Sequence, residues 1–454
     1  MKIQLHYCLT VLMTAVGFSA MGVVPTAPSL TTVGTNSTRL TSFREKARVG
    51  RSGLFSKGDS MADSYRSAAY WNMTWMSHSV GIAGYALNNY GNKSLWASSG
   101  GAVLVNVLTN TAMRKYWFND FVLTPPGSEL WWETQGSPNG IFSDRLGVFS
   151  VKYPGGGMFP LMVSTNGGPW GTLLWLDGYT SDLDGEGYPV VDIVMEPNYY
   201  RTKIGVSTNT AATNIILGRY VENSQAPGTI SIFMDRGGID LGYMTNVSPK
   251  IRDPIFSALY RLSHSNVLML WHMKEPVGPS LTARLLECAT VQSNAMPDMA
   301  IAYIGTPITS QDSNFLSADT ITVQQNAAVR DFTVASEQTY VDCQNPCHSM
   351  DWMVAQGYIE SDLVHETKLG NQYFGAIVWN ALFNIERNLE IKQGPGYVTI
   401  SHGRSFWGRY VLQTSTNLVD WSDMNTSSGT DQPFSVDVPT TGSMRMFRLQ
   451  WGPP

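Results

Sequence analysis

The stretch Gly53-Leu54-Phe55-Ser56-Lys57-Gly58-Asp59-Ser60 is the best single guide to the fold of this 454-residue chain. Its short apolar beginning predicts a buried strand, and Ser60 would lie where that strand turns into a helix. Such a turn exposes a hydroxyl beside backbone N–H groups that have no acceptor within the helix. A second motif lies near the other end of the chain, Asp362-Leu363-Val364-His365, shortly before the helical pattern of residues 373–383.

These two motifs together contain the side chains that nucleophilic catalysis needs. A neutral serine is a weak nucleophile, so a base must take its proton during attack and a carboxylate must hold that base in the correct tautomer. We therefore predict Ser60 as the nucleophile, His365 as the base and Asp362 as the carboxylate that orients it. Each motif alone is weak, because such residues are common in turns. Their order in an α/β-like sequence favours catalysis over coincidence.

The composition excludes some classes of protein. Charged residues make up only 14% of the chain and the net charge is −5, so no basic surface for nucleic acid is expected. Residues 1–22 have the layout of a secretory signal peptide, with a retained membrane anchor as the alternative. We expect a secreted or periplasmic protein with no membrane span after removal of the signal.

The cysteines and histidines predict no cofactor or metal. Removal of the signal would leave Cys288, Cys343 and Cys347, and the last two could form a disulfide across a tight loop. A zinc site that combined them with His348 would lack a fourth ligand at a recognisable spacing.

The pattern of apolar runs and turn residues along the sequence predicts an α/β fold with a parallel sheet flanked by helices. This sheet is interrupted by an inserted antiparallel β-sandwich and followed by a small C-terminal all-β module. Buried strands that alternate with helices indicate the α/β regions, and short apolar runs between Gly, Pro and Asn indicate the sandwich. The expected order is a flexible leader over 23–51, a first α/β segment over 52–100, the sandwich over 101–229, a second α/β segment over 230–394, and the β module over 395–454.

The serine and histidine blocks resemble those of the SGNH (GDSL) hydrolase superfamily. The chain is more specifically similar to the peptidoglycan O-acetylesterase-like branch, in which a β-sandwich of carbohydrate-binding type interrupts the hydrolase domain. Residues 155–164 look like the glycine-rich strand entry of that insert. The resemblance implies an SGNH fold and the hydrolysis of acyl esters.

The resemblance also implies an oxyanion hole, because attack on an ester builds negative charge on the carbonyl oxygen. The backbone N–H of Ser60 would be one donor. A glycine N–H would be the second, with Gly242, Gly238 in a shorter loop and Gly84 in a rival loop as candidates.

The third donor of the family is an asparagine, and here the chain departs from the family pattern. Lys274 stands in its place, followed by the acidic Glu275. A lysine can donate to an oxyanion or pair with Glu275 instead. His272 just before it could be a packed histidine or a second base, and Met61 replaces the histidine that often follows the serine.

The leading hypothesis is an exported esterase that removes acetyl or other acyl groups from a carbohydrate through a Ser60 acyl-enzyme. The alternatives are an acyltransferase with the same triad and a non-catalytic carbohydrate-binding protein on a degenerate hydrolase fold. The expected partner is an acylated carbohydrate, with the oligomeric state open. Aromatic residues of the insert would either stack on sugars or fill its core: Trp131, Trp132, Trp170, Trp175, Tyr199 and Tyr200.

Overall fold

The computed structural model describes most of the chain between residues 33 and 452. The described residues are 33–34, 37–58, 79–83, 97–106, 108–118, 120–132, 141–224, 229–233, 241–272, 280–307, 315–347, 350–383, 389–395, 397–402, 409–415, 422–426, 434–439 and 446–452. Several predicted features lie outside them: the signal peptide, Ser60, Gly84, Gly238 and Lys274.

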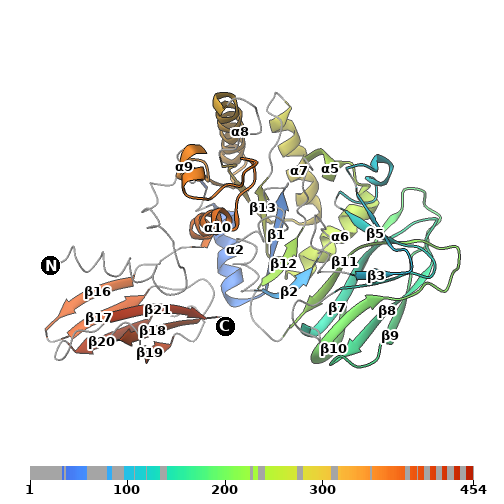
Figure 1. The fold of residues 1–454 in the computed structure, drawn as a ribbon, viewed down its shortest axis with the longest axis horizontal. Helices are drawn as coiled ribbons and strands as arrows, with labels where there is room; N and C mark the ends of the chain where they lie inside the picture. Colours follow the sequence, from blue (N-terminus) through green and yellow to red (C-terminus); the bar gives the residue numbers. More distant parts are fainter. Residues whose placement is uncertain are drawn as a thin grey trace. The chain divides into compact units, whose positions relative to one another are not determined.

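A parallel sheet forms the centre of the fold (Figure 1). Its strands run in the order β15-β14-β13-β1-β12-β2, and each pair of neighbours is parallel. The strands are β1 (Ser52–Gly58), β2 (Ser79–Ala83), β12 (Thr229–Phe233), β13 (Val267–His272), β14 (Ala300–Ile304) and β15 (Thr339–Val341). The apolar runs predicted as buried parallel strands therefore form such strands.

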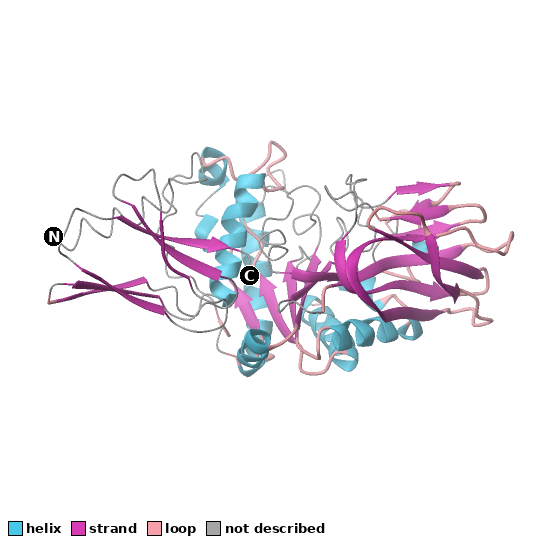
Figure 2. Ribbon diagram, turned by 90° about the horizontal axis from the view of Figure 1, so that it is seen from below, coloured by secondary structure: helices cyan, strands magenta, loops and turns pink. Residues whose placement is uncertain are grey.

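Helices cover both faces of this sheet (Figure 2). On one face Phe55 of β1 meets Phe256 of α6 edge to face, with ring centroids 6.3 Å apart. Leu54 points to the opposite face, where α2 contacts β1, β13 and β14. Because both faces are buried, β14 is apolar throughout and β13 is apolar up to its last residue, His272. The helices are α2 (Thr38–Val49), α5 (Leu241–Thr245), α6 (Pro249–Leu262), α7 (Leu281–Ala295), α8 (Phe315–Ala335), α9 (Met350–Ala355) and α10 (Lys368–Phe383).

The predicted antiparallel insert is present and continues the same hydrogen-bonded sheet. Strand β2 is parallel to β12 on one side and antiparallel to β11 on the other, and the order then runs β11-β7-β10-β6-β3. The strands of the insert are β3 (Ala97–Ser99), β4 (Val103–Val105), β5 (Phe121–Thr124), β6 (Glu129–Trp131), β7 (Ile141–Lys152), β8 (Met158–Thr165), β9 (Gly171–Asp177), β10 (Glu186–Ile204) and β11 (Asn214–Glu222). The sheet has 15 strands in the described portion of the chain.

Strand β7 belongs to two hydrophobic cores. Phe149 and Val151 pack in the core that α6 and the parallel strands share. Leu146 and Val148 point the other way, into the interior of the sandwich. The sandwich therefore has a core of its own and also shares in the core of the α/β region, because one of its layers covers α6.

The glycine-rich entry to β8 allows two backbone segments to approach closely. A Cβ atom at Gly156 would lie 1.9 Å from the carbonyl oxygen of Gly178. Only glycine fits at such a distance, which explains the glycine at this position.

The C-terminal region of the chain forms a second compact unit, whose boundary lies between Val378 and Trp379 within α10. It contains two antiparallel three-stranded sheets, β16-β17-β20 and β19-β18-β21. Their strands are β16 (Leu389–Gly394), β17 (Tyr397–His402), β18 (Arg409–Ser415), β19 (Ser422–Thr426), β20 (Phe434–Pro439) and β21 (Met446–Gly452). A small core of Ile400, Leu412 and Val438 joins the two sheets.

Candidate active site

The sheet order places the predicted site at a topological switch point. Strand β1 lies between β12 and β13, and the chain moves to opposite sides of β1 before and after α6. In sheets of this kind, ligands bind in the crevice outside the carboxyl ends of the strands at that point. Gly58, the last residue of β1, is the register partner of His272, the last residue of β13. The segments that carry Ser60 and Lys274 therefore begin from adjacent strand ends.

The structure brings the predicted base and its orienting carboxylate together. Nδ1 of His365 lies 2.7 Å from Oδ2 of Asp362. The His365 side chain is 14% exposed and that of Asp362 is 39% exposed, so the imidazole is sheltered while the carboxylate reaches solvent. A proton on Nδ1 facing the carboxylate leaves Nε2 as the basic nitrogen, which is the tautomer that a general base requires.

The backbone of this turn is fixed by the same carboxylate. Oδ1 of Asp362 accepts hydrogen bonds from the N–H groups of Val364 and His365, each at 3.0 Å. Leu363 has a positive φ of 55°, which lets the chain reverse within the turn. The N–H of Glu360 donates to the carbonyl of His365 at 2.7 Å and closes the loop. Asp362 therefore orients the imidazole through both the side chain and the backbone of His365.

These hydrogen bonds also set the charge of Asp362. Burial raises its pKa, but the hydrogen bonds from the backbone and side chain of His365 and from the backbone of Val364 outweigh that effect. The pKa falls to about 2 from its usual 3.8. Asp362 is thus ionised at any pH at which the imidazole could act as a base.

The helix that follows holds the turn in place. Thr367 caps α10, because its hydroxyl oxygen accepts from the N–H of Gly370 at 3.1 Å and its hydroxyl donates to the carbonyl of Gly357 at 2.6 Å. Tyr358, on the other side of the turn, stacks on Tyr373 of α10 with ring centroids 4.8 Å apart. The turn is therefore anchored on both of its flanks.

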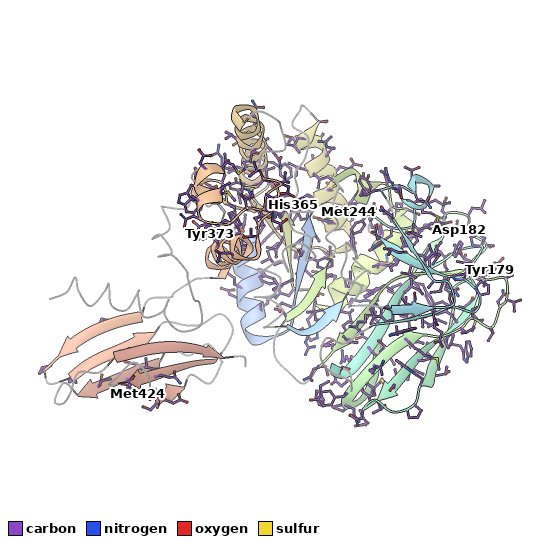
Figure 3. The ribbon with its side chains drawn as sticks, viewed as in Figure 1. Tyr179, Asp182, Met244, His365, Tyr373 and Met424 are labelled. Carbon is purple, nitrogen blue, oxygen red and sulfur yellow. The ribbon has the colours of Figure 1, made fainter. Side chains whose placement is uncertain are left out.

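The turn lies near the carboxyl end of the parallel sheet. Burial raises the pKa of the Cys343 thiol, and the nearby carboxylates of Asp342 and of the buried Glu366, the residue next to His365, raise it further. Cys343 follows shortly after the carboxyl end of β15. Figure 3 shows His365 beyond the tip of the β1 arrow, on the side of the sheet where the serine segment begins.

The structure places two of the remaining candidates. Gly242 lies in the first turn of α5, in the segment that follows β12, and its carbonyl accepts from the hydroxyl of Thr245 at 3.0 Å. His272 is 6% exposed, and burial lowers its pKa to about 4, so it is neutral at pH 7. It is a buried neighbour of the serine strand. The roles of Gly242, Gly238 and Lys274 as oxyanion donors stay predictions.

The described residues add three observations on metals, cysteines and membranes. They contain no group of at least three His, Cys, Asp or Glu side chains placed to hold a metal. Cys288 is buried, and its thiol donates to the carbonyl of Leu241 at 3.2 Å. The side chain of Cys347 lies outside the described residues, so the bridge to Cys343 stays a prediction. No described helix has the length and apolarity needed to span a membrane.

Sequence reasoning missed the residues that hold the turn. Thr367 directly before a helical pattern is a recognisable N-cap signal, and it could have been found. The stacking of Tyr358 on Tyr373 could not, because these residues are brought together by the reversal of the chain between them.

The fold and the turn define an α/β protein with its Asp-His turn after the last parallel strand, β15, and an antiparallel insert after the second parallel strand, β2. No model of a protein family matches the sequence, and no curated protein matches it either.

Solved structures do match. A peptidoglycan O-acetylesterase matches with a TM-score of 0.56 at 15% identity, over 77% of this chain and 96% of that one. A candidate SGNH hydrolase from Slackia heliotrinireducens matches at 17% identity over 34% of this chain and 85% of that one, with a TM-score of 0.26. A family two carbohydrate esterase from Cellvibrio japonicus matches at 9% identity over 63% and 99%, with a TM-score of 0.23.

The first of these matches supports a conclusion about the fold, since the other two TM-scores are too low to carry one. The chain has the SGNH hydrolase fold in the arrangement of the peptidoglycan O-acetylesterase. The resemblance predicted from the serine and histidine blocks is thereby confirmed at the level of the fold.

Proposed function

We propose that this protein is an exported serine esterase that removes O-acyl groups, acetyl in the first place, from a carbohydrate. The observation that carries the proposal is the contact of 2.7 Å between Nδ1 of His365 and Oδ2 of Asp362. An ionised carboxylate on Nδ1, in a turn held from both sides, is the arrangement that a histidine base needs. The switch point beside β1 supports the choice of Ser60 as its partner, because that serine follows the strand end at the crevice.

In the first half of the proposed reaction, Ser60 Oγ attacks the carbonyl carbon of the ester while His365 Nε2 takes the hydroxyl proton. The tetrahedral intermediate then collapses, and the imidazolium gives this proton to the departing sugar oxygen. Asp362 stabilises the positive charge of the imidazolium without taking the proton itself. The products of this half are the free sugar hydroxyl and an acylated Ser60.

In the second half, water attacks the acyl carbon with His365 again as the base, and the acid and free Ser60 are released. The negative charge that forms on the carbonyl oxygen in both halves needs donors. The N–H groups of Ser60 and Gly242 and the ammonium of Lys274 are our candidates. A preorganised donor of this kind typically lowers the barrier by about 3–4 kcal/mol.

Turnover of 4-nitrophenyl acetate and release of acetate from acetylated xylan test the proposal. Ser60→Ala and His365→Ala should each lower kcat by at least about 10³-fold. Ser181→Ala, at an exposed serine of the insert, is the matched control and should change nothing. If Ser60→Ala turns over both substrates at the rate of the parent protein, the esterase proposal fails.

The same experiment separates hydrolysis from acyl transfer. A hydrolase releases one acetate for each ester consumed, whether or not a sugar acceptor is present. If an acetylated acceptor accumulates in place of free acetate, the reaction is acyl transfer rather than hydrolysis, with the same serine and histidine.

A further inference from the structure

The short helix α5 carries Gly242, the candidate oxyanion donor, in the segment that follows β12. Because β12 is a parallel neighbour of β1, this segment starts from the strand end beside the one that leads to Ser60. Figure 3 shows Met244 of α5 at the same end of the sheet as His365. The placement of α5 therefore decides where the N–H of Gly242 lies.

The backbone of Gly242 must be held by its surroundings. A glycine has no Cβ and adopts a wide range of φ and ψ, whereas a donor to an oxyanion has to be preorganised. The carbonyl of Gly242 is fixed locally, since it accepts from the hydroxyl of Thr245 at 3.0 Å and from the N–H of Asn246 at 3.2 Å. The N–H of Gly242 belongs to the preceding peptide group, whose other end is the carbonyl of Leu241.

Cys288 of α7 holds that preceding peptide group. Its thiol donates to the carbonyl oxygen of Leu241 at 3.2 Å, and both residues are buried. The peptide group is planar and trans, so its N–H and its carbonyl point in opposite directions. A donor on the carbonyl of Leu241 therefore also sets the direction of the Gly242 N–H. It polarises the same peptide group as well, which makes that N–H a better donor.

A second residue of α7 supports the same helix. Gln292 follows Cys288 by four residues, so both lie on one face of α7. Its Nε2 donates to Sδ of Met244 at 3.1 Å, and both side chains are buried. Helix α5 is thus held against α7 at two points, one before Gly242 and one after it.

The insert contacts α5 as well. The guanidinium of Arg114, in the loop between β4 and β5, lies 4.3 Å from the ring centre of Tyr243. The carbonyl of Lys115 accepts from the N–H of Ser248, just after α5, at 3.1 Å. Arg114 is itself held, because its Nη2 donates to the carbonyl of Leu108 at 3.0 Å. Helix α5 therefore lies between α7 and a loop of the insert.

We propose that Cys288 and Arg114 are positioning residues for the oxyanion hole, which together direct the N–H of Gly242 towards the ester. Cys288 acts on the peptide group of the donor, and Arg114 lets the insert stabilise the same helix. Neither acts on the ester itself. This inference rests on the proposed esterase function with Gly242 as a donor, and it gives the insert a part in turnover.

Steady-state hydrolysis of 4-nitrophenyl acetate by the full chain tests the role of Cys288. Cys288→Ala removes the donor and should lower kcat by about tenfold, the loss expected for one hydrogen bond. Acylation and deacylation both use the oxyanion hole and slow together, so KM should stay within about twofold of the parent value. Cys288→Ser keeps a donor of similar size and should restore kcat. Leu286→Ala, at a residue of α7 that is 58% exposed, is the matched control and should change neither quantity.

The same assay tests the role of Arg114. Arg114→Met keeps most of the stem but removes the cation from the ring of Tyr243, and it should lower kcat by about fivefold. Arg114→Lys keeps a cation over the ring and should recover most of the loss. Because Cys288 and Arg114 act through one helix, the double variant Cys288→Ala with Arg114→Met should lose less than the product of the two single effects.

Two further readouts separate positioning from a loss of stability. Labelling of Ser60 with a fluorophosphonate counts the active sites, so that kcat is expressed per site. The midpoint of the pH profile of kcat/KM reports the titration of His365 and should match that of the parent protein in every variant. A purely structural role would lower Tm and the number of sites but leave kcat per site unchanged.

The outcomes that contradict the proposal are distinct for its two parts. An unchanged kcat per site in Cys288→Ala, or a Cys288→Ser variant as slow as Cys288→Ala, removes the role of Cys288. An unchanged kcat per site in Arg114→Met removes the role of Arg114, and a shifted pH midpoint in either variant assigns its effect to the His365 turn instead. In all these cases Ser60→Ala is still inactive. If Ser60→Ala is active, the esterase proposal fails and the positioning inference fails with it.

Discussion

The two halves of the large sheet differ in what they leave exposed. In the parallel half, helices cover both faces, and Gly58 and His272 stand side by side where two strands end. In the antiparallel half, β10 contacts α6 along part of its length, and further along it carries Tyr200 inside the sandwich and Tyr199 outside. The first half therefore has its open edge at the carboxyl ends of the strands, whereas the second is a layer packed between a helix and the rest of the sandwich.

This difference follows from how the two kinds of sheet are connected. Parallel neighbours need crossover helices, and these helices cover the faces. Antiparallel neighbours can be joined by short turns, which need no helix on either face. A substitution at the carboxyl edge of the parallel half should therefore affect turnover, and a substitution between the two halves should affect stability.

The largest expected effect is on turnover, at the carboxyl edge of the parallel half. Asp362→Asn keeps the shape of the side chain but removes its charge and allows the wrong tautomer of His365. We expect kcat for 4-nitrophenyl acetate to fall by about 10³–10⁴-fold. Steady-state kinetics measure this loss, and a variant with full turnover would break the assignment of Asp362.

The next effect is on stability, at the strand shared by the two cores. Phe149 of β7 is 1% exposed and packs in the core that includes α6. Phe149→Ala should lower the free energy of unfolding by about 3–5 kcal/mol. Trp175→Ala, in the same antiparallel half but exposed, should change it by less than about 0.5 kcal/mol.

Denaturant titration of both variants checks this prediction. If the two cores are coupled through β7, Phe149→Ala should shift the unfolding of the parallel half and of the insert together. An insert that unfolds separately, with the parallel half unaffected, would contradict the shared core.

A smaller effect is expected at the helix cap behind the turn. Thr367→Ala removes the hydroxyl that binds Gly370 N–H and the carbonyl of Gly357. We expect a loss of about 0.5–2 kcal/mol in the free energy of unfolding, with a lower kcat because His365 is less well held. Thr367→Ser keeps the hydroxyl and should restore both quantities. If serine and alanine behave alike, the cap does not position the turn.

The smallest effect concerns acid stability. The pKa of Asp362 is lowered from 3.8 to about 2 in the folded chain. Its contribution to stability is therefore fully present above the unfolded value and is lost as the pH falls through the folded value. The difference in Tm between the parent protein and Asp362→Asn should be constant at neutral pH and shrink as the pH falls from 3.8 towards 2. A difference that persists to the lowest pH would contradict the lowered pKa.

Much of the parallel half was predictable from the sequence. Runs such as residues 267–271 and 299–304 are apolar throughout, which only a strand buried on both faces or a buried helix requires. The Asp362 to His365 contact was predictable from its spacing alone, because a carboxylate three residues before a histidine reaches it within one turn. The continuity of the sheet was not, because the antiparallel pairing of β2 with β11 joins residues far apart in the chain.

The candidate site was predictable only to a limited extent. The motifs predicted its residue types and the positions of Asp362 and His365. They did not predict that the stacking of Tyr358 on Tyr373 holds the turn, because this contact depends on packing across a chain reversal. The division of the tryptophans between core and surface was also hidden. Adjacent aromatic residues have the same hydrophobicity, and only the register of the strand decides which one points inwards.

Side-chain type and local spacing were enough to identify the residues that can carry the chemistry and the segments that must be buried. Two features arise only in the folded chain: Gly58 and His272 end side by side, and β7 serves two cores. The reason is physical. Local spacing fixes the conformation of a turn or strand, but its neighbours are set by pairings between distant segments, whose stability depends on the whole core.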